Sequence, residues 1–327
     1  MRSIFKLTFR SIKSFIGRYM ALLLIVTLSV GFFAGLKITK DAMANTADIY
    51  FSEQSLYDYR LISTLGFTDS EKDELSELSF VEYAEGVKSL DAMVELEDSS
   101  RSFHLIAMPE NVSLPSLVTG RLPEADDECL ADAGAFSEED IGSVVYISDN
   151  ASEQLSQTEY TIVGLANSPM YLGLERGTTN IGNGSLDGFI YLPADAFTSE
   201  YYTEIQLTLS ETADAYSDEY DELIDSHKDE ISQACEELAA KRYDDILAQT
   251  GLSAEVAEQM GLSEPDTYVL TRNENSGYVS FENDTSIVSG IANIFPVFFV
   301  LIAMLVCMTT MTRMVDCLLY TSPSPRD

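Results

Sequence analysis

The sequence predicts an α+β fold in which two transmembrane helices flank a mixed α+β extracytoplasmic domain with a long, coiled-coil-like helical arm. Three observations predict it. Residues 19–36 and 287–311 are apolar runs without a charged side chain. Between them, Asp41 to Asp284 contains 52 acidic and 10 basic residues. Short strand-like segments and one long segment of helical period fill that acidic region.

Residues 1–18 are predicted to form a basic amphipathic helix on the cytoplasmic side. Apolar side chains recur at helical spacing on one face, and Lys and Arg occupy the other. Such a helix lies along the inner leaflet of a membrane. It serves either as an anchor alone or as a contact for a cytoplasmic partner. The candidate contact residues are Phe5, Phe9, Arg10, Ile12 and Lys13.

The first apolar run, residues 19–36, is predicted to be a transmembrane helix. Its eighteen residues would rise about 27 Å, close to the thickness of a bilayer's hydrocarbon core. A cleaved signal peptide is the alternative, but the run is longer than a usual signal and no small-residue cleavage site follows it. Within the run, Gly31 and Gly35 are candidate contacts for another membrane helix.

The charge distribution predicts which side of the membrane each segment occupies. Residues 1–36 contain Lys and Arg but no acidic residue, whereas residues 41–284 carry a net formal charge of −42. Basic segments stay on the cytoplasmic side of a span, so the N-terminus is predicted inside and residues 37–286 outside. So acidic a domain is repelled by nucleic acid, which excludes DNA and RNA as partners.

The extracytoplasmic domain is predicted over residues 37–210, with helical, strand and loop segments in the following order. Residues 37–54 continue the first helix, and residues 68–79 form a helix that Thr68 caps together with Glu71. Residues 117–123 form a turn, and residues 167–188, rich in Gly and Asn, form an extended loop. The predicted strands, mostly antiparallel, cover residues 57–64, 81–96, 102–107, 129–131, 143–147, 160–165, 188–191 and 203–209.

The Gly- and Asn-rich loop is the candidate functional surface of the domain, although a purely structural cluster of turns has the same composition. Its candidate surface residues are Pro169, Tyr171, Arg176 and Asn183.

The C-terminal third begins with the helical arm, residues 211–263. Its apolar stripe fits one arm of a helical hairpin or coiled coil, and equally a single helix packed on the domain. Residues 264–286 are predicted to return as a strand to the second transmembrane helix, residues 287–311, where Pro296 predicts a kink. Residues 312–327 end in CLLYTSPSPRD, which predicts a non-native tail on an N-terminal fragment that natively continues past Asp316.

The sequence contains no motif for catalysis, cofactor binding or metal binding. Walker A, G-x-S-x-G, H-E-x-x-H and calcium-loop patterns are all absent. We therefore expect no enzymatic activity, no cofactor and no metal site. His104 and His227 have no partner pattern and fit ordinary surface or strand positions. Whether Cys129 and Cys235 form a disulfide stays open at this point.

Several stretches resemble FtsX/MacB-like ABC transporter permeases of Gram-positive bacteria. The resemblance covers residues 1–316. The stretches that carry it are TGRLPEADDECLAD (119–132), YTIVGLANSPMYLGLERGTTNIGNG (160–184), YVLTRNENSGYVSF (268–281) and the re-entry segment FENDTSIVSGIANIFPVFFVLIAMLVCMTTMTRMV. The resemblance implies a multi-pass protein of the bacterial cell membrane that pairs with a cytoplasmic ABC ATPase subunit and acts as a permease dimer in lipid.

This resemblance implies a function in which ATP-driven motion passes through the spans to the extracytoplasmic domain. The outputs it implies are export or extrusion, peptide resistance and control of wall enzymes. The alternatives are a two-span sensor or receptor with a ligand-binding domain, and a membrane-anchored scaffold. Residues beyond Asp316 would discriminate among the three: further spans fit the permease, a kinase domain fits the sensor, and a stop fits the scaffold.

Overall fold

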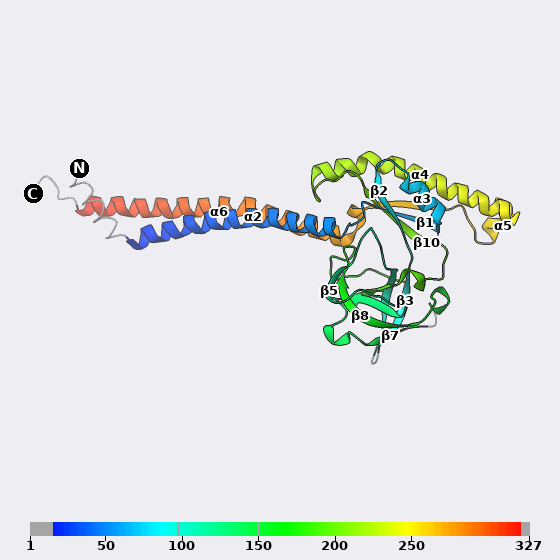
Figure 1. The fold of residues 1–327 in the computed structure, drawn as a ribbon. Helices are drawn as coiled ribbons and strands as arrows, with labels where there is room; N and C mark the ends of the chain where they lie inside the picture. Colours follow the sequence, from blue (N-terminus) through cyan, green and yellow to red (C-terminus); the bar gives the residue numbers. More distant parts are fainter. Residues whose placement is uncertain (1–15, 97–98, 149–150, 322–327) are drawn as a thin grey trace, which may run out of the picture. The chain divides into compact units, whose positions relative to one another are not determined.

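The fold is described here from a computed structural model, which covers residues 16–96, 99–148 and 151–321 (Figure 1). Within these residues the chain divides into two compact units. One is formed from residues 16–44 and 282–321, and the other is Asn45–Phe281.

The first unit contains the apolar parts of helices α2 (Ile16–Glu53) and α6 (Ser276–Thr321). Leu23–Glu53 and Ser276–Arg313 are long and apolar enough to cross a membrane. The ring of Phe32 lies 5.5 Å from that of Phe295, so the two helices pack on each other at this level. Both predicted apolar runs therefore lie in helices, and the predicted continuation of the first helix to residue 54 is confirmed as far as Glu53.

The second unit begins with an antiparallel sheet, called sheet A here, whose strand order is β11-β1-β10-β2. Its alternating side chains give it two different faces. Tyr59, Leu61, Ile205 and Leu207 point to one face and belong to an apolar core. Helix α4 covers that face (Figure 1). The strands are β1 (Tyr59–Phe67), β2 (Val81–Val87), β10 (Tyr202–Leu209) and β11 (Thr267–Thr271).

Helix α4 (Asp218–Thr250) packs along sheet A. Of the two interpretations of the predicted arm, the structure therefore has the single helix packed on the domain. Tyr216 precedes the helix and has a positive φ of 63°. The buried residues of α4 are Tyr220, Ile224, Ile231, Cys235, Leu238, Ala239 and Tyr243. A short helix, α5 (Ala254–Gln259), follows.

The other sheet, among the described residues, has the order β5-β8-β6-β9-β4-β3-β7, and an additional β8–β7 pairing closes it into a barrel. Strand β5 lies outside the barrel, paired with the second half of β8. The barrel interior is one apolar core that includes Phe103, Leu105 and Tyr160. Its strands are β3 (Ser89–Leu96), β4 (Ser99–Ala107), β5 (Ser116–Gly120), β6 (Glu128–Asp132), β7 (Val144–Ile147), β8 (Glu159–Asn167) and β9 (Gly188–Leu192).

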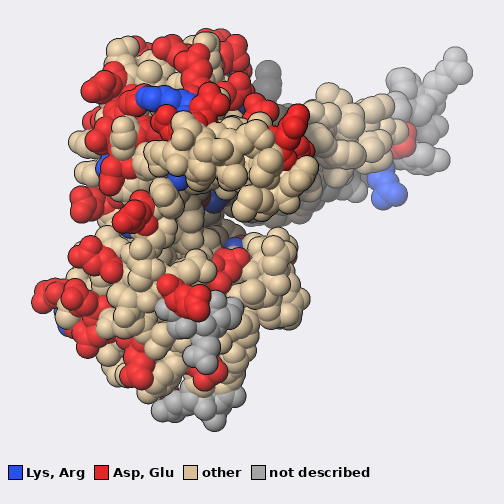
Figure 2. All heavy atoms as spheres, turned by 90° about the vertical axis from the view of Figure 1, so that its right-hand side faces the viewer, with Lys and Arg blue, Asp and Glu red and all other residues tan. Residues whose placement is uncertain are grey.

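The capped helix predicted after the first strand is present as α3 (Asp69–Ser76). The backbone N–H of Glu71 donates to the Thr68 hydroxyl, and the Glu71 carboxylate accepts from the Thr68 backbone N–H at 2.6 Å. This reciprocal pair is the capping box that the sequence predicted. Figure 2 shows the acidic surface of the chain, where Asp and Glu side chains far outnumber Lys and Arg on the face in view.

Three predicted segments differ from the structure. The strand expected over residues 81–96 is two strands, since β2 pairs with β10 in sheet A while β3 pairs with β4 in the barrel. The turn expected at residues 117–123 begins as strand β5. The strand expected over residues 264–286 is wrong after Thr271, because α6 begins at Ser276. The Asn275 side chain accepts the first free N–H groups of that helix, which is a cap that the sequence analysis missed.

Candidate functional site

The end of α2 and the beginning of α6 meet in a buried aromatic cluster, which we call the junction cluster. Phe51 of α2 and Tyr278 of α6 are each exposed by 2% or less, and their ring centroids lie 5.4 Å apart. The Tyr216 ring stacks on Tyr278 at 4.3 Å. Large buried aromatic rings contribute strongly to packing energy. The fully buried members are Ala47, Phe51, Leu56, Tyr57, Val112, Ala215 and Tyr278.

An ion pair between Arg272 and Asp58 lies beside the junction cluster. The Nη2 atom of Arg272 is 3.0 Å from Oδ1 of Asp58, and the guanidinium also donates to the two carbonyl groups that precede Asp58. Asp58 accepts from the Tyr220 hydroxyl at 2.9 Å and from the Leu209 N–H at 2.8 Å. Burial opposes the charge on Arg272, but the facing Asp58 carboxylate raises its pKa overall. The pair therefore joins the starts of β1, α4 and the turn before α6.

The Gly- and Asn-rich loop between β8 and β9 is held against the barrel by Arg176. Its Nε atom donates to Asp132 at 2.6 Å, and Nη2 donates to the other carboxylate oxygen at 3.0 Å. Asp132 is fully buried in β6. The same guanidinium donates to the carbonyl oxygen of Gly173 and lies 6.0 Å from the Tyr171 ring, which stacks on Phe189. A bidentate, buried Arg–carboxylate pair fixes geometry strongly, so this loop is an ordered part of the domain.

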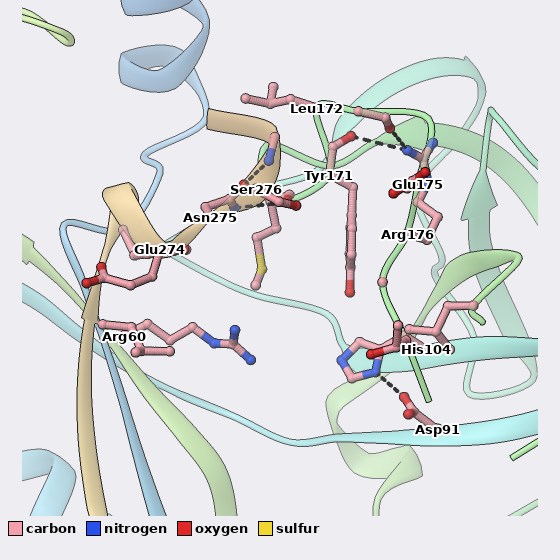
Figure 3. A pocket seen from close by; sticks show the side chains of 18 residues that line it. Arg60, Asp91, His104, Tyr171, Leu172, Glu175, Arg176, Glu274, Asn275 and Ser276 are labelled. Atoms are coloured by element: carbon pink, nitrogen blue, oxygen red, sulfur yellow. Dashed lines mark hydrogen bonds and ion pairs between the residues drawn. The ribbon is translucent and has the colours of Figure 1, made fainter. Parts of the chain in front are cut away.

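Beside this loop lies a cavity of about 290 Å³, which we call the loop cavity (Figure 3). Strand β1 contributes Arg60, the barrel contributes Asp91 and His104, and the start of α6 contributes Asn275. Figure 3 shows the Arg60 guanidinium, the Tyr171 side chain and the His104 ring directed toward one space. The cavity thus brings together sheet A, the barrel and the loop, three parts distant in sequence.

Arg60 and His104, two basic side chains of the loop cavity, each already have a carboxylate partner. Nε of Arg60 is 2.5 Å from Glu204, and Nδ1 of His104 is 2.6 Å from Asp91. The hydrogen bond from His104 lowers the pKa of Asp91 despite partial burial. Burial raises the pKa of Tyr171, so its phenol stays protonated and can donate a hydrogen bond. These groups can recognise a polar ligand, but they include no activated nucleophile.

The predicted site residues are partly assembled in the structure. Tyr171 and Arg176 line the loop cavity. Pro169 is buried and offers no side-chain surface, which corrects its prediction as a surface residue. Asn183 is exposed but does not line the cavity; its side-chain oxygen accepts from Ser185 within a turn.

The predicted membrane contacts remain predictions. A Cβ atom added at Gly31 or Gly35 would meet nothing within 4 Å, so the part of the chain that the structure describes leaves that face of α2 open. Pro296 lies inside the continuous helix α6. The predicted leaflet contacts Phe5, Phe9, Arg10, Ile12 and Lys13 lie outside the described residues.

The structure answers the question about the cysteines. Cys129 and Cys235 are both free and buried, the first in the barrel core and the second on the face of α4 that packs on sheet A. Burial raises the pKa of the Cys129 thiol and raises that of Cys235 to about 12. Neither thiol is ionised at neutral pH, so both behave as small apolar core residues.

Sequence reasoning missed the charged residues that connect the parts of the domain. Arg60 and Arg272 each pair with a carboxylate that is distant in the sequence, and His104 pairs with Asp91 on the neighbouring strand. The scarcity of basic residues was one available signal. The domain has only 10 basic residues beside 52 acidic ones, so its few Arg residues stand at specific positions. The identity of each partner depends on strand pairing, which the sequence does not display.

Comparison with known proteins gives matches to solved structures alone. No protein-family model and no curated protein matches the chain. The extracellular domain of the noncanonical ABC-type transporter YknZ from Gram-positive bacteria matches with 11% identity and a TM-score of 0.35, over 65% of this chain and 98% of that one. The periplasmic region of MacB from Actinobacillus actinomycetemcomitans matches with 10% identity and a TM-score of 0.33, over 72% and 95%.

Since both identities are 11% or less and both TM-scores are below 0.5, the matches carry no conclusion about what this chain binds or moves.

Proposed function

We propose that this chain is a membrane permease subunit of an ABC transporter and that it transmits motion from a cytoplasmic ATPase subunit to its extracytoplasmic domain. It works as a permease dimer in the lipid bilayer, with residues 1–18 inside and residues 37–286 outside. The sequence stretches that resemble FtsX/MacB-like permeases support this proposal.

The observation that carries the proposal is the shared end point of the two apolar helices. Helix α2 runs without interruption from Ile16 to Glu53, and α6 runs from Ser276 to Thr321. Phe51 near the end of one and Tyr278 near the start of the other lie in the same buried cluster. A displacement of either helix along its axis therefore acts on the domain core rather than on a flexible linker.

The direct test measures coupling to a cytoplasmic ABC ATPase from the same organism. The native protein and that ATPase are co-purified in nanodiscs, and ATP hydrolysis is measured with and without the permease. We expect a stable complex whose hydrolysis rate differs from that of the ATPase alone. Failure to associate, together with an unchanged hydrolysis rate, would contradict the proposal.

A matched pair of variants tests whether α2 transmits the motion as a rigid helix. Residues 41–44 (DAMA) lie between the apolar run and the junction cluster. Replacing them with four glycines costs about 1 kcal/mol of helix stability per residue, whereas four alanines preserve the helix. The glycine variant should bind the ATPase but lose the effect on hydrolysis, and the alanine variant should retain it. Equal behaviour of the two would contradict transmission through α2.

The proposed sidedness has its own test in intact cells. A cysteine introduced at position 4 should stay protected from a membrane-impermeant maleimide, and one introduced at position 144, an exposed strand position, should react. The reverse pattern would contradict both the orientation and the transporter proposal that depends on it.

The loop cavity favours the second candidate, a two-span sensor with a ligand-binding domain. Its volume of about 290 Å³ is near the lower end of the range for small-molecule sites. The ATPase experiment separates the candidates, because a sensor would not change the hydrolysis rate of that ATPase.

A further inference from the structure

A second cavity, separate from the loop cavity, lies where α2 ends in the domain. It has a volume of about 370 Å³, and we call it the acidic cavity. Four carboxylates and one guanidinium line it, so its formal charge is −3. The charged residues are Asp48, Asp58, Glu82, Glu211 and Arg272.

Arg272, the basic side chain of this wall, already has hydrogen-bond and ion-pair partners. Arg272 pairs with Asp58 and donates its remaining hydrogen bonds to backbone carbonyls. Asp48 accepts a hydrogen bond from the Ala215 N–H at 2.8 Å. Glu82 and Glu211 are exposed at the rim, and within the described residues neither carboxylate has an ion-pair partner. Three carboxylates of the wall, those of Asp48, Glu82 and Glu211, therefore have no cation partner among the described residues.

A buried hydroxyl at the same cavity lacks a partner. Thr208 is 8% exposed and lines the acidic cavity, and its Oγ1 atom has no hydrogen-bond partner. Buried polar atoms in native proteins are nearly always satisfied, so an unsatisfied one at a cavity wall indicates a missing ligand or water. This observation is independent of the carboxylates and concerns a residue of the same wall.

The backbone adds to the negative potential. Ser52 of the cavity wall lies in the last turn of α2, which contains no basic side chain. A helix C-terminus carries a partial negative charge that favours a cation. Around it, the other polar side chains of the wall are hydroxyls of Ser, Thr and Tyr, which accept hydrogen bonds.

We propose that the acidic cavity binds an organic cation that bears a primary ammonium group. An ammonium has three N–H donors and no acceptor, which complements a wall of carboxylates and hydroxyls. Leu209, Ala213 and Phe51 supply apolar wall for an attached alkyl chain, and the exposed Tyr83 ring at the rim can hold the cation on its face. A divalent metal fits poorly, because no cluster of three or more His, Cys, Asp or Glu among the described residues could hold one.

Two sources carry this chemistry, a free polyamine and a lysine side chain of a peptide. The test uses isothermal titration calorimetry on the full chain in phosphatidylcholine nanodiscs, which bear no net charge, at low ionic strength. Spermidine and the amide of Nα-acetyl-lysine are the two probes. Saturable binding of spermidine alone identifies a polyamine, and binding of the lysine amide at equal or higher affinity identifies a peptide side chain. Absence of saturable binding by both overturns the proposal.

A pair of charge-matched variants separates this cavity from the general acidity of the domain. The double variant E82Q/E211Q removes the two rim charges, and E138Q/E139Q removes two exposed charges from the barrel. We expect the bound probe's affinity to fall about tenfold in the first and less than about twofold in the second. An equal loss in both variants would show non-specific attraction to a polyanion and would overturn the proposal.

The variant Thr208→Val tests whether the Thr208 hydroxyl contributes to binding, and it keeps the shape of the side chain. Replacing an unpaired buried hydroxyl with a methyl group should leave the thermal midpoint of the free protein unchanged or higher. Affinity for the probe should fall about threefold or more, because the ammonium loses an acceptor. A variant that binds as tightly as the natural protein would show that Thr208 does not touch the ligand and would overturn the site. The proposal does not depend on the permease function, since binding is measured without the ATPase.

Discussion

The two faces of sheet A show opposite chemistry on the same four strands. Toward α4, strand β10 presents Ile205, Leu207 and Leu209, all buried in an apolar core. On the other face the same strand presents Glu204, Gln206 and Thr208, which are buried to a similar degree but polar. Gln206 is 1% exposed, and its Oε1 atom has no hydrogen-bond partner.

This difference indicates which contact is permanent and which can rearrange. Apolar burial against α4 is non-directional. Separating the two surfaces exposes them to water, which is unfavourable in free energy. The polar face meets the loop and both cavities, where specific hydrogen bonds can be exchanged for water or for a ligand. We therefore expect the apolar contact between sheet A and α4 to be harder to separate than the polar contacts on the other face.

The largest expected effect comes from breaking the ion pair at the edge of the polar face. Arg272→Met leaves the carboxylate of Asp58 buried without its cation, which should cost about 3–5 kcal/mol of unfolding free energy. Chemical denaturation of the chain in nanodiscs measures it. The double variant D58N/R272M should recover part of that loss, and a loss below about 1 kcal/mol in the single variant would show that the pair does not support the junction.

The apolar face should respond next most strongly. Leu207→Ala removes a fully buried side chain of the core under α4, with an expected loss of about 3 kcal/mol from transfer and cavity terms. The same denaturation experiment measures it. Leu174→Ala is the matched control, since that side chain is 100% exposed and its removal should change stability by less than about 0.5 kcal/mol.

On the polar face, by contrast, replacing a hydrogen-bonding side chain with an apolar one of the same length should be nearly neutral. Gln206→Met keeps the length of the side chain and removes the unpaired Oε1 atom. We expect the unfolding free energy to change by less than about 1 kcal/mol, because the hydrogen bond lost to Glu204 offsets the removed desolvation penalty. A loss as large as that of Leu207→Ala would contradict the contrast between the two faces.

The smallest effect should come from an ion pair outside both faces. The bidentate pair with Arg121 lowers the pKa of Glu128 in the barrel to about 2. A lowered pKa stabilises the folded state above the ordinary carboxyl pKa, and this stabilisation is lost as the pH falls from about 4.5 toward 2. Thermal midpoints measured across that window should fall less steeply for Glu128→Gln. Identical slopes would show that the pair has no effect on folding.

Sequence reasoning succeeded where the signal is local. The two apolar helices, the capping box at Thr68 and Glu71, and most strands follow from periodicity and from contacts within a few residues. It failed at Asn275, where a polar residue after a strand begins a helix instead of continuing the strand. The alternation Tyr–Val–Leu–Thr does not show where the strand ends, because the cap depends on one side-chain rotamer.

The candidate site was predictable only in part for the same reason. The loop at residues 167–188 stands out by composition, and Tyr171 and Arg176 were identified within it. Their partners Asp132 and Phe189 lie on separate barrel strands, and nothing in the local sequence links them.

By itself, the sequence determined that two membrane-length apolar helices enclose a strongly acidic α+β domain, since length, hydropathy and charge are properties of single segments. The tertiary structure alone decided that α4 packs on a sheet, that β2 and β3 belong to different sheets, and that Thr208 reaches a carboxylate-lined cavity. Each of these depends on which distant strands pair. The packing of the whole domain makes that choice, because the alternating side-chain pattern of each strand fits more than one partner strand.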